Sequence, residues 1–468
     1  MDRNPRFDAL HQVADPVVAS AIEHFVANAA DDALVRLDVL GFARDHSLGE
    51  EKVIDAFVHA AKLGLFDMSW NLLCPGCGGI LDAGANLKQM RDSYDCSLCA
   101  AAYEPTLDEM VEVSFTVNPS VRRIAAHEPD SLSLFDYYRS MYFSNRLVMP
   151  KGSGYAAMWD RFTFESEEVP PGDKVILSLN IPPKFLILFE PITHTAVFLD
   201  VKGEPVRERR DLTVVYTGSG ISTTKHEFAP GPLRLTLVNG TNQRILPALF
   251  LAEEEFHEQL STLQPILTAK RLFTNQTFRD LYRTDTVNID QRLKIASLTV
   301  LFTDLKASTE LYDRVGDLVA YDLVRAHFKV LTDVVRAESG AVVKTIGDAV
   351  MATFPSSELG VSAAFRMRHA MDALNEQRKH EDLIVKIGMH EGPCLAVISN
   401  ERLDYFGQTV NIAARVQGLA TARSIFVTEP VVSHRGVQQF LASNGVSTTE
   451  HKASLKGIAD EMTVYEIP

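Results

Sequence analysis

The sequence predicts an α+β protein of several domains. Its 468 residues are enough for about three domains. Apolar residues recur at helical spacing near the start, alternate with period two in the middle, and mix both patterns towards the end. A cluster of four cysteines separates the first part from the second. With 46% hydrophobic and 23% charged residues, each part has enough apolar side chains to bury a core.

The charge balance excludes some classes of partner. The chain has 46 Lys and Arg against 61 Asp and Glu, a formal net charge of -15. This argues against a protein that mainly holds nucleic acid or an anionic membrane surface. The first residues, MDRNPRFDAL, lack the features of a signal peptide, and no apolar stretch approaches the roughly 20 residues that span a bilayer. We therefore expect a cytoplasmic protein with no membrane span.

Residues 1–68 are predicted to form a helical, winged-helix-like domain. Apolar residues at three-to-four spacing over 33–44 and 49–63 predict two helices with a break at 46–49. The apolar segment that follows is a candidate wing strand. The second helix begins with Glu50 and Glu51, where a DNA-reading helix needs cations near phosphate. We therefore favour a protein contact or a structural role over DNA binding.

Residues 69–107 are predicted to form a zinc ribbon. Two CxxC pairs stand eighteen residues apart, a separation suited to one tetrahedral zinc site. A site with four Cys ligands is closed, which favours a structural Zn²⁺; thiol redox sensing is the alternative. The ligands are Cys74, Cys77, Cys96 and Cys99.

Residues 108–251 are predicted to form an antiparallel β-sandwich with a regulatory role. Runs with period-two alternation, such as those at 111–117 and 233–237, are separated by Pro and Gly. The pattern leaves open whether the domain binds a small ligand or a protein. Residues 252–290 are predicted to be a helical connector, whose apolar side chains either form a dimer seam or pack on the sandwich.

Residues 291–468 contain the candidate chemistry. A buried strand ends at Asp304, and a hairpin further on has Asp348 at its tip. If the strands are neighbours, the two carboxylates converge and provide the oxygen ligands that Mg²⁺ prefers; the alternative is two ordinary turn residues. Asn411 and Arg415 stand four apart on one helix face, where they either bind phosphate oxygens or belong to a solvated surface.

Four segments of this last domain carry a family resemblance. FTDLKAST, VKTIGDAVMATF, LDYFGQTVNIAARV and SLKG, in that order, resemble the catalytic domain of class III nucleotidyl cyclases. The resemblance implies a ferredoxin-like α/β domain whose active sites lie between two copies in a homodimer. It also implies two Mg²⁺ or Mn²⁺ ions per site. The residues with implied roles are Asp304, Leu305 and Asp348 at the metals, Lys344 and Asp404 at the base, Asn411 and Arg415 in catalysis, and Lys456 at the terminal phosphates.

The expected substrate is ATP. Adenine has an acceptor at N1 and an amino donor at N6, which complement a cation at Lys344 and an acceptor at Asp404; guanine presents the reverse pattern. The chain is thus expected to be an adenylate cyclase that makes 3′,5′-cyclic AMP and pyrophosphate. The layout of the N-terminal part resembles a regulatory region of some bacterial soluble cyclases, and its regulator would be an unidentified small molecule or protein. The alternatives are a guanylate cyclase, or a transcriptional or signalling regulator that binds nucleotide without turnover.

Overall fold

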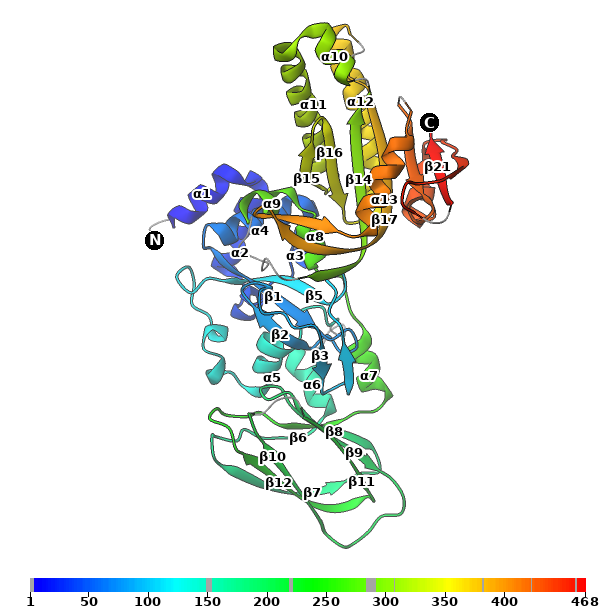
Figure 1. The fold of residues 1–468 in the computed structure, drawn as a ribbon. Helices are drawn as coiled ribbons and strands as arrows, with labels where there is room; N and C mark the ends of the chain where they lie inside the picture. Colours follow the sequence, from blue (N-terminus) through cyan, green and yellow to red (C-terminus); the bar gives the residue numbers. More distant parts are fainter. Residues whose placement is uncertain are drawn as a thin grey trace. The chain divides into compact units, whose positions relative to one another are not determined.

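The computed structural model describes residues 4–148, 154–218, 222–282, 292–306, 308–380, 383–421, 423–458 and 461–468. The chain divides into two compact units (Figure 1). The first consists of Met1–Ala85, Gln89–Pro105 and Glu109–Leu267, and the second of Asn86–Lys88, Thr106–Asp108 and Thr268–Pro468. None of the helices in the described ranges has the length and apolar composition that crossing a bilayer requires.

Four helices open the first unit. The two predicted helices are α3 and α4. The two helices that precede them, α1 and α2, were not predicted. Both missed helices have a recognisable start, because Asn4 and Asp15 cap them and a proline follows each cap. The bounds are α1 (Pro5–Val13), α2 (Pro16–Asn28), α3 (Val39–Asp45) and α4 (Glu50–Lys62).

A three-stranded antiparallel sheet, β2-β1-β5, follows these helices. The strand expected after the second helix is β1 (Phe66–Leu73), which pairs with β2 (Ile80–Gly84) and β5 (Val111–Val117). We expected β5 in the sandwich, but it belongs to this sheet. Phe115 of β5 packs against Phe57 of α4, with ring centroids 5.4 Å apart. Phe115 of the strand is thus covered by α4.

Short helices follow β5, in a range expected to be all β. Their aromatic side chains stack, with 4.7 Å between the ring centroids of Phe143 and Trp159 and 5.7 Å between those of Tyr138 and Trp159. The elements are the 3-10 helices Ala125–His127 and Pro129–Ser131, α5 (Leu134–Tyr137), the π-helical turn Tyr138–Tyr142 and α6 (Tyr155–Phe162).

Two further sheets, β10-β12-β7 and β11-β9-β8-β13-β6, share one buried apolar cluster. The expected antiparallel pairing holds for β7 with β12 and for β8 with β9, whereas β10 with β12 and β9 with β11 are parallel. From β9 to β12 the chain alternates between the two sheets, so strands two apart in sequence run side by side in one direction. The bounds are β6 (Thr163–Ser166), β7 (Lys174–Ile181), β8 (Phe185–Glu190), β9 (Thr195–Val201), β10 (Arg210–Tyr216), β11 (Ser222–Phe228), β12 (Gly231–Asn239) and β13 (Ala248–Leu251).

The predicted connector is divided among three short helices. α7 (Glu254–Ser261) lies in the first unit, while α8 (Ala269–Phe273) and α9 (Gln276–Leu281) lie in the second. Phe256 and Leu260 are buried within the chain itself, which favours the packing alternative over an exposed dimer seam. The last part of the predicted connector, 283–290, lies outside the described residues.

The second unit contains an eight-stranded sheet with helices on both faces. Strands follow the order β15-β16-β14-β17-β19-β21-β20, and β18 pairs with β17. Ile425 and Val427 of β19 belong to the core shared with α11 and α12, whereas Phe426 points to the other face and packs with α13. The strands are β14 (Leu293–Leu305), β15 (Ala341–Ile346), β16 (Ala349–Phe354), β17 (Val385–Ser399), β18 (Arg402–Phe406), β19 (Ile425–Thr428), β20 (Thr449–Ala453) and β21 (Met462–Ile467). The helices are α10 (Ser308–Val315), α11 (Asp317–Ala337), α12 (Ser357–Arg378), α13 (Gln408–Leu419), α14 (Glu429–Val432) and α15 (Arg435–Ser443).

A distant part of the chain completes this sheet. β14 has a bulge between Ile295 and Leu298, where its pairing with β17 shifts register. The Asp108 carboxylate accepts hydrogen bonds from the backbone N–H groups of Ala296, at 2.9 Å, and Ser297, at 3.1 Å. The Leu107 N–H also donates to the carbonyl of Lys294. Residues 106–108 therefore satisfy backbone groups that the bulge leaves without a strand partner.

Gly388→Ala is expected to destabilise the second unit. An added Cβ at Gly388 would lie 2.1 Å from the backbone nitrogen of Gln417, so α13 would have to move away from β17. Overpacking of this kind costs about 1–3 kcal/mol or more. Thermal unfolding of the full chain measures the loss. Gly418→Ala in the same helix is the control, because nothing lies within 4 Å of its Cβ position; an equal loss in both variants would contradict the argument.

Candidate active site

Two carboxylates lie at one end of two neighbouring strands. Thr303 of β14 pairs with Val350 of β16, and Asp304 is the next residue after Thr303. Asp348 sits in the turn between β15 and β16, where Gly347 takes a φ of 63°. The predicted hairpin is therefore confirmed. Burial raises the pKa of Asp304, and repulsion by the nearby Asp348 carboxylate raises it further.

The surroundings of these carboxylates fit a bound cation. The Oδ2 atom of Asp348 is buried and has no hydrogen-bond partner among the described residues. A buried carboxylate oxygen without a donor is costly, and a divalent cation would supply the missing partner. His327 of α11 lies beside the backbone of Asp348; burial lowers the pKa of this imidazole to about 4, so it is neutral at pH 7. Leu305 is buried at the end of β14, next to Asp304.

Lys344 and Asp404 form an ion pair although they come from different strands. The Nζ atom of Lys344 on β15 lies 2.6 Å from Oδ2 of Asp404 on β18. The Lys344 side chain is 40% exposed and the Asp404 side chain 16% exposed. The other carboxylate oxygen, Oδ1, accepts the backbone N–H of Tyr405 at 2.8 Å. The two residues expected at the base are thus brought together, with Lys344 partly open to solvent.

The expected phosphate-binding residues lie on α13 and in the loop before β21. Arg415 approaches this loop at Gly457, where an added Cβ would lie 3.4 Å from the guanidinium. Lys456 precedes this glycine and is exposed, as is Asn411 one helical turn before Arg415. The side chain of Gln417, two residues after Arg415, lies close enough to Asp304 to oppose the rise in the pKa of that carboxyl. Asn411 and Arg415 thus lie one turn apart on α13, and the loop that carries Lys456 approaches Arg415 at Gly457.

The four cysteines form a separate cluster in the first unit. Their Sγ atoms all lie within 4.8 Å of one another, with 3.6 Å between Cys74 and Cys99 and 3.8 Å between Cys77 and Cys96. Four thiolates in a tetrahedron around Zn²⁺ at about 2.3 Å are roughly 3.8 Å apart, so the arrangement fits this ion. Hydrogen bonds among the thiols lower the pKa of Cys74 and raise the pKa of Cys77 and Cys99, as expected for sulfur atoms that compete for protons at close range.

Sequence reasoning missed three residues that position these groups. Gln417 lies beside Asp304, His327 is buried near the backbone of Asp348, and Gly388 allows α13 to approach β17 closely. Of these three residues, only His327 has a local signal in the sequence, because it is a histidine on the apolar face of a helix. The other two contacts depend on how distant segments pack, which no local pattern records.

Comparison with known families accounts for both parts of the chain. Residues 1–280 match a family of unknown function (DUF5939), and residues 291–467 match the family described as the adenylate and guanylate cyclase catalytic domain. The chain belongs to the DUF5939 family and carries a class III cyclase domain. The resemblance noted in the sequence is thereby confirmed, and the carboxylate edge of β14 and β16 lies in this cyclase domain.

Relatives match the cyclase domain over part of their length. An adenylate cyclase of Anabaena cylindrica is 25% identical over 185 residues, which are 36% of this chain and 36% of the relative. Adenylate cyclase 2 of Rhizobium meliloti is 30% identical over 181 residues, 36% of this chain and 48% of the relative. The chain thus spans less than half the length of these relatives.

Solved structures of cyclases of both kinds are also similar to this domain. Adenylyl cyclase CyaB from P. aeruginosa is 22% identical with a TM-score of 0.34, and the match covers 38% of this chain and 96% of that one. The guanylate cyclase domain of RhGC from Catenaria anguillulae, in complex with GTP, is 19% identical with a TM-score of 0.32, covering 37% and 97%.

Proposed function

We propose that the chain is an adenylate cyclase, which converts ATP to 3′,5′-cyclic AMP and pyrophosphate at sites formed between two copies. In this reaction the ribose 3′-oxygen bonds to the α-phosphorus, the bond from that phosphorus to the bridging oxygen breaks, and pyrophosphate leaves. The hydroxyl proton passes to water or to a substrate oxygen. Residues before the cyclase domain regulate the reaction. The observation that carries the choice of ATP is the Lys344–Asp404 pair.

Lys344 and Asp404 recognise the base. The Lys344 ammonium donates to N1 of adenine, and the Asp404 carboxylate accepts from the N6 amino group. Guanine would place its N1–H donor against the ammonium of Lys344 and its O6 acceptor against the carboxylate of Asp404. Because both side chains are partly buried, this mismatch leaves charged groups poorly paired, which can reduce kcat/KM by a factor of about 10⁴.

Asp304 and Asp348 would hold the metal ions, with Leu305 beside them. When bound, Mg²⁺ or Mn²⁺ provides Lewis-acid polarisation of the α-phosphate and makes the 3′-hydroxyl more acidic. Burial, and then repulsion by the nearby Asp348 carboxylate, raises the pKa of Asp304, and a cation bound between the two carboxylates would relieve this repulsion. Asn411 orients the substrate, Arg415 stabilises charge that develops in the transition state, and Lys456 binds the terminal phosphates.

The requirement for a second copy is supported by the geometry of α13. Residues of an α-helix are separated by about 100°, so Arg415 and Gln417 point about 200° apart. Gln417 contacts Asp304 of its own chain, and Arg415 therefore projects away from that carboxylate. In a homodimer, the Arg415 of one copy would complete the site that contains Asp304 and Asp348 of the other.

The direct test is turnover by the purified full chain with Mg²⁺ or Mn²⁺, comparing ATP with GTP. We expect cyclic AMP from ATP and little cyclic GMP. Production of cyclic GMP alone would identify a guanylate cyclase, and absence of product from both nucleotides would favour the regulator that only binds nucleotide.

Reversing the base-contacting pair is expected to reverse nucleotide preference. The double variant Lys344→Glu, Asp404→Ser should lose at least about 100-fold in kcat/KM for ATP and gain relative activity with GTP, because guanine now meets an acceptor at N1. Initial rates at several concentrations of each nucleotide measure the change. The double variant Lys329→Glu, Asp333→Ser, at an exposed ion pair of α11, makes the same change in charge and is the control. An unchanged ratio of the two nucleotides would show that the pair does not contact the base.

A further inference from the structure

We propose that helix α9 is a positioning element for base recognition, acting through Gln276 and Arg279. The inference rests on the proposed function, since it concerns the residues that would contact adenine. Lys344 and Asp404 lie on different strands that are not neighbours in the sheet. α9 binds the backbone of both strands, next to each of the two residues.

The contact with β15 occurs at an irregularity in the strand. Val342 pairs with Ala352 of β16 and Lys344 with Met351, so one extra residue is inserted before Lys344. A bulge of this kind re-aims the following side chain and leaves a backbone group without its usual partner. The Oε1 atom of Gln276 accepts the N–H of Val342 at 2.8 Å. Gln276 therefore stabilises the bulge that sets the direction of Lys344.

The contact with β18 flanks Asp404 on both sides. The guanidinium of Arg279 donates a hydrogen bond to the backbone carbonyl of Leu403. On the other side, the hydroxyl of Tyr405 donates to the backbone carbonyl of Phe273 in α8, at 3.2 Å. Burial raises the pKa of Tyr405 to about 12, so this hydroxyl keeps its proton at pH 7. Asp404 is thus held between two residues that are tied to α8 and α9.

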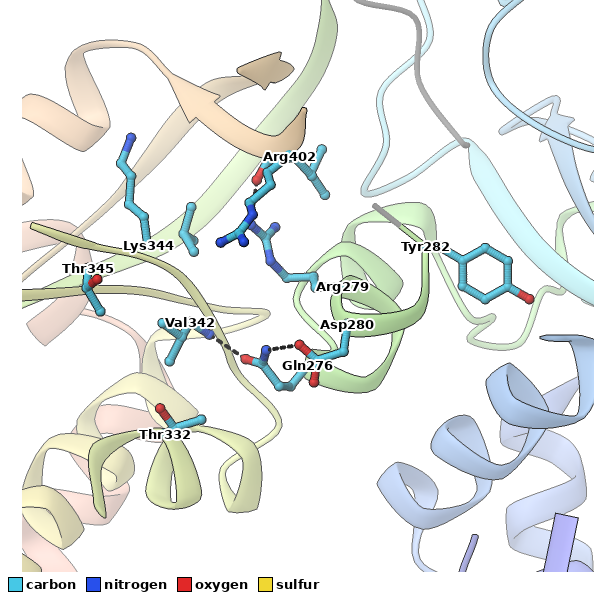
Figure 2. Close-up of a pocket in the computed structure, with 11 residues that line it drawn as sticks. Gln276, Arg279, Asp280, Tyr282, Thr332, Val342, Lys344, Thr345 and Arg402 are labelled. Carbon is cyan, nitrogen blue, oxygen red and sulfur yellow. Dashed lines mark hydrogen bonds between the residues drawn. The ribbon is translucent and has the colours of Figure 1, made fainter. Parts of the chain in front are cut away.

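Figure 2 shows how Gln276 and Arg279 are arranged on α9. Gln276 points to Val342 and also donates to Asp280 at 2.9 Å, which fixes the orientation of its amide. Arg279 points to the strand that carries Arg402. A cavity of about 290 Å³ lies between α9 and strands β15 and β18. Side-chain hydrogen bonds across this space, rather than continuous packing alone, therefore set the distance between the helix and the two strands.

A shift of α9 would consequently move the two base-contacting residues relative to each other. The base is remote from the reacting 3′-oxygen and α-phosphorus. Interactions there contribute mainly to substrate binding and selectivity, so their loss raises KM more than it lowers kcat. This expectation separates a positioning role from general support of the fold, which would lower the amount of active enzyme and hence kcat.

The experiment compares Gln276→Ala and Arg279→Ala with the unaltered full chain. Each variant should raise KM for ATP and reduce the ratio of kcat/KM for ATP to that for GTP by roughly tenfold, with kcat within about threefold. The double variant Gln276→Glu, Asp280→Asn retains the acceptor for Val342 and a donor–acceptor pair between positions 276 and 280, and should restore most of the selectivity. Arg336→Ala is the control, because it removes the exposed ion pair with Asp280 and leaves the contacts to β15 and β18 intact.

Hydrogen exchange provides a second readout that does not require turnover. The Val342 amide and the β18 segment should exchange faster in the two alanine variants, while the core strand β14 is unchanged. An unaltered nucleotide ratio, or equal exchange of Val342 with and without Gln276, would overturn this inference. Absence of turnover in the unaltered chain would overturn the proposed function alone; the ratio of dissociation constants for ATP and GTP would then replace that of kcat/KM.

Discussion

Asp348→Ala is expected to abolish cyclisation of ATP, lowering kcat by about 10³-fold or more. The substitution removes a carboxylate whose buried Oδ2 atom lacks a protein partner, and with it a ligand of the cation that polarises the phosphate. Cyclic AMP formation by the full chain measures the effect. Asp333→Ala on the exposed face of α11 is the control and should retain activity, since its carboxylate forms an exposed ion pair with Lys329.

Mixing two inactive variants provides a sharper version of this test. Consider a mixed dimer in which one copy has Asp348→Ala and the other has Arg415→Ala. If each site is built from both copies, the two changes fall in the same site and the other site is intact. An equal mixture should therefore recover about a quarter of the unaltered activity, because half of the dimers are mixed and each has one functional site. No recovery, with mixed dimers demonstrated, would contradict a site shared between copies.

Cys74→Ser is expected to release the metal and unfold the region around the four cysteines. Structural Zn²⁺ contributes on the order of 10 kcal/mol to folding, and the thiolates at Cys77, Cys96 and Cys99 would remain without their shared cation. Metal content should fall from one zinc per chain to none, and the first thermal transition should move down by more than about 10 °C. Cys394→Ala removes the other cysteine and should keep the zinc. A full zinc content in Cys74→Ser would show that Cys74 is not a ligand.

Local sequence patterns predicted the features that local geometry determines. The turn at Asp348 follows from a Gly-Asp pair between two short apolar strands, and the convergence of four cysteines follows from two CxxC turns. The partnership of Lys344 with Asp404 was expected only from the family resemblance, since 60 residues separate them and no periodicity connects them.

Other features were not predictable because they depend on long-range packing. The pairing of β5 with β1 depends on the cover that α4 provides, which the period-two pattern of β5 does not reveal. The predicted helical connector divides into three helices, and Pro265 with the capping residues Thr268 and Asn275 are the local signals for this division. The contacts of Gln276 and Asp108 join segments that are 66 and 188 residues apart.

The position of Asp108 has a consequence for the modularity of the protein. Residues 106–108 belong to the second unit although the chain returns to the first unit for another 159 residues. A gene fusion at any single point between them and residue 268 separates the sheet from the carboxylate that caps the amides of Ala296 and Ser297. A fragment that begins at residue 268 therefore lacks these two hydrogen bonds, and its sheet is expected to be less stable than in the full chain.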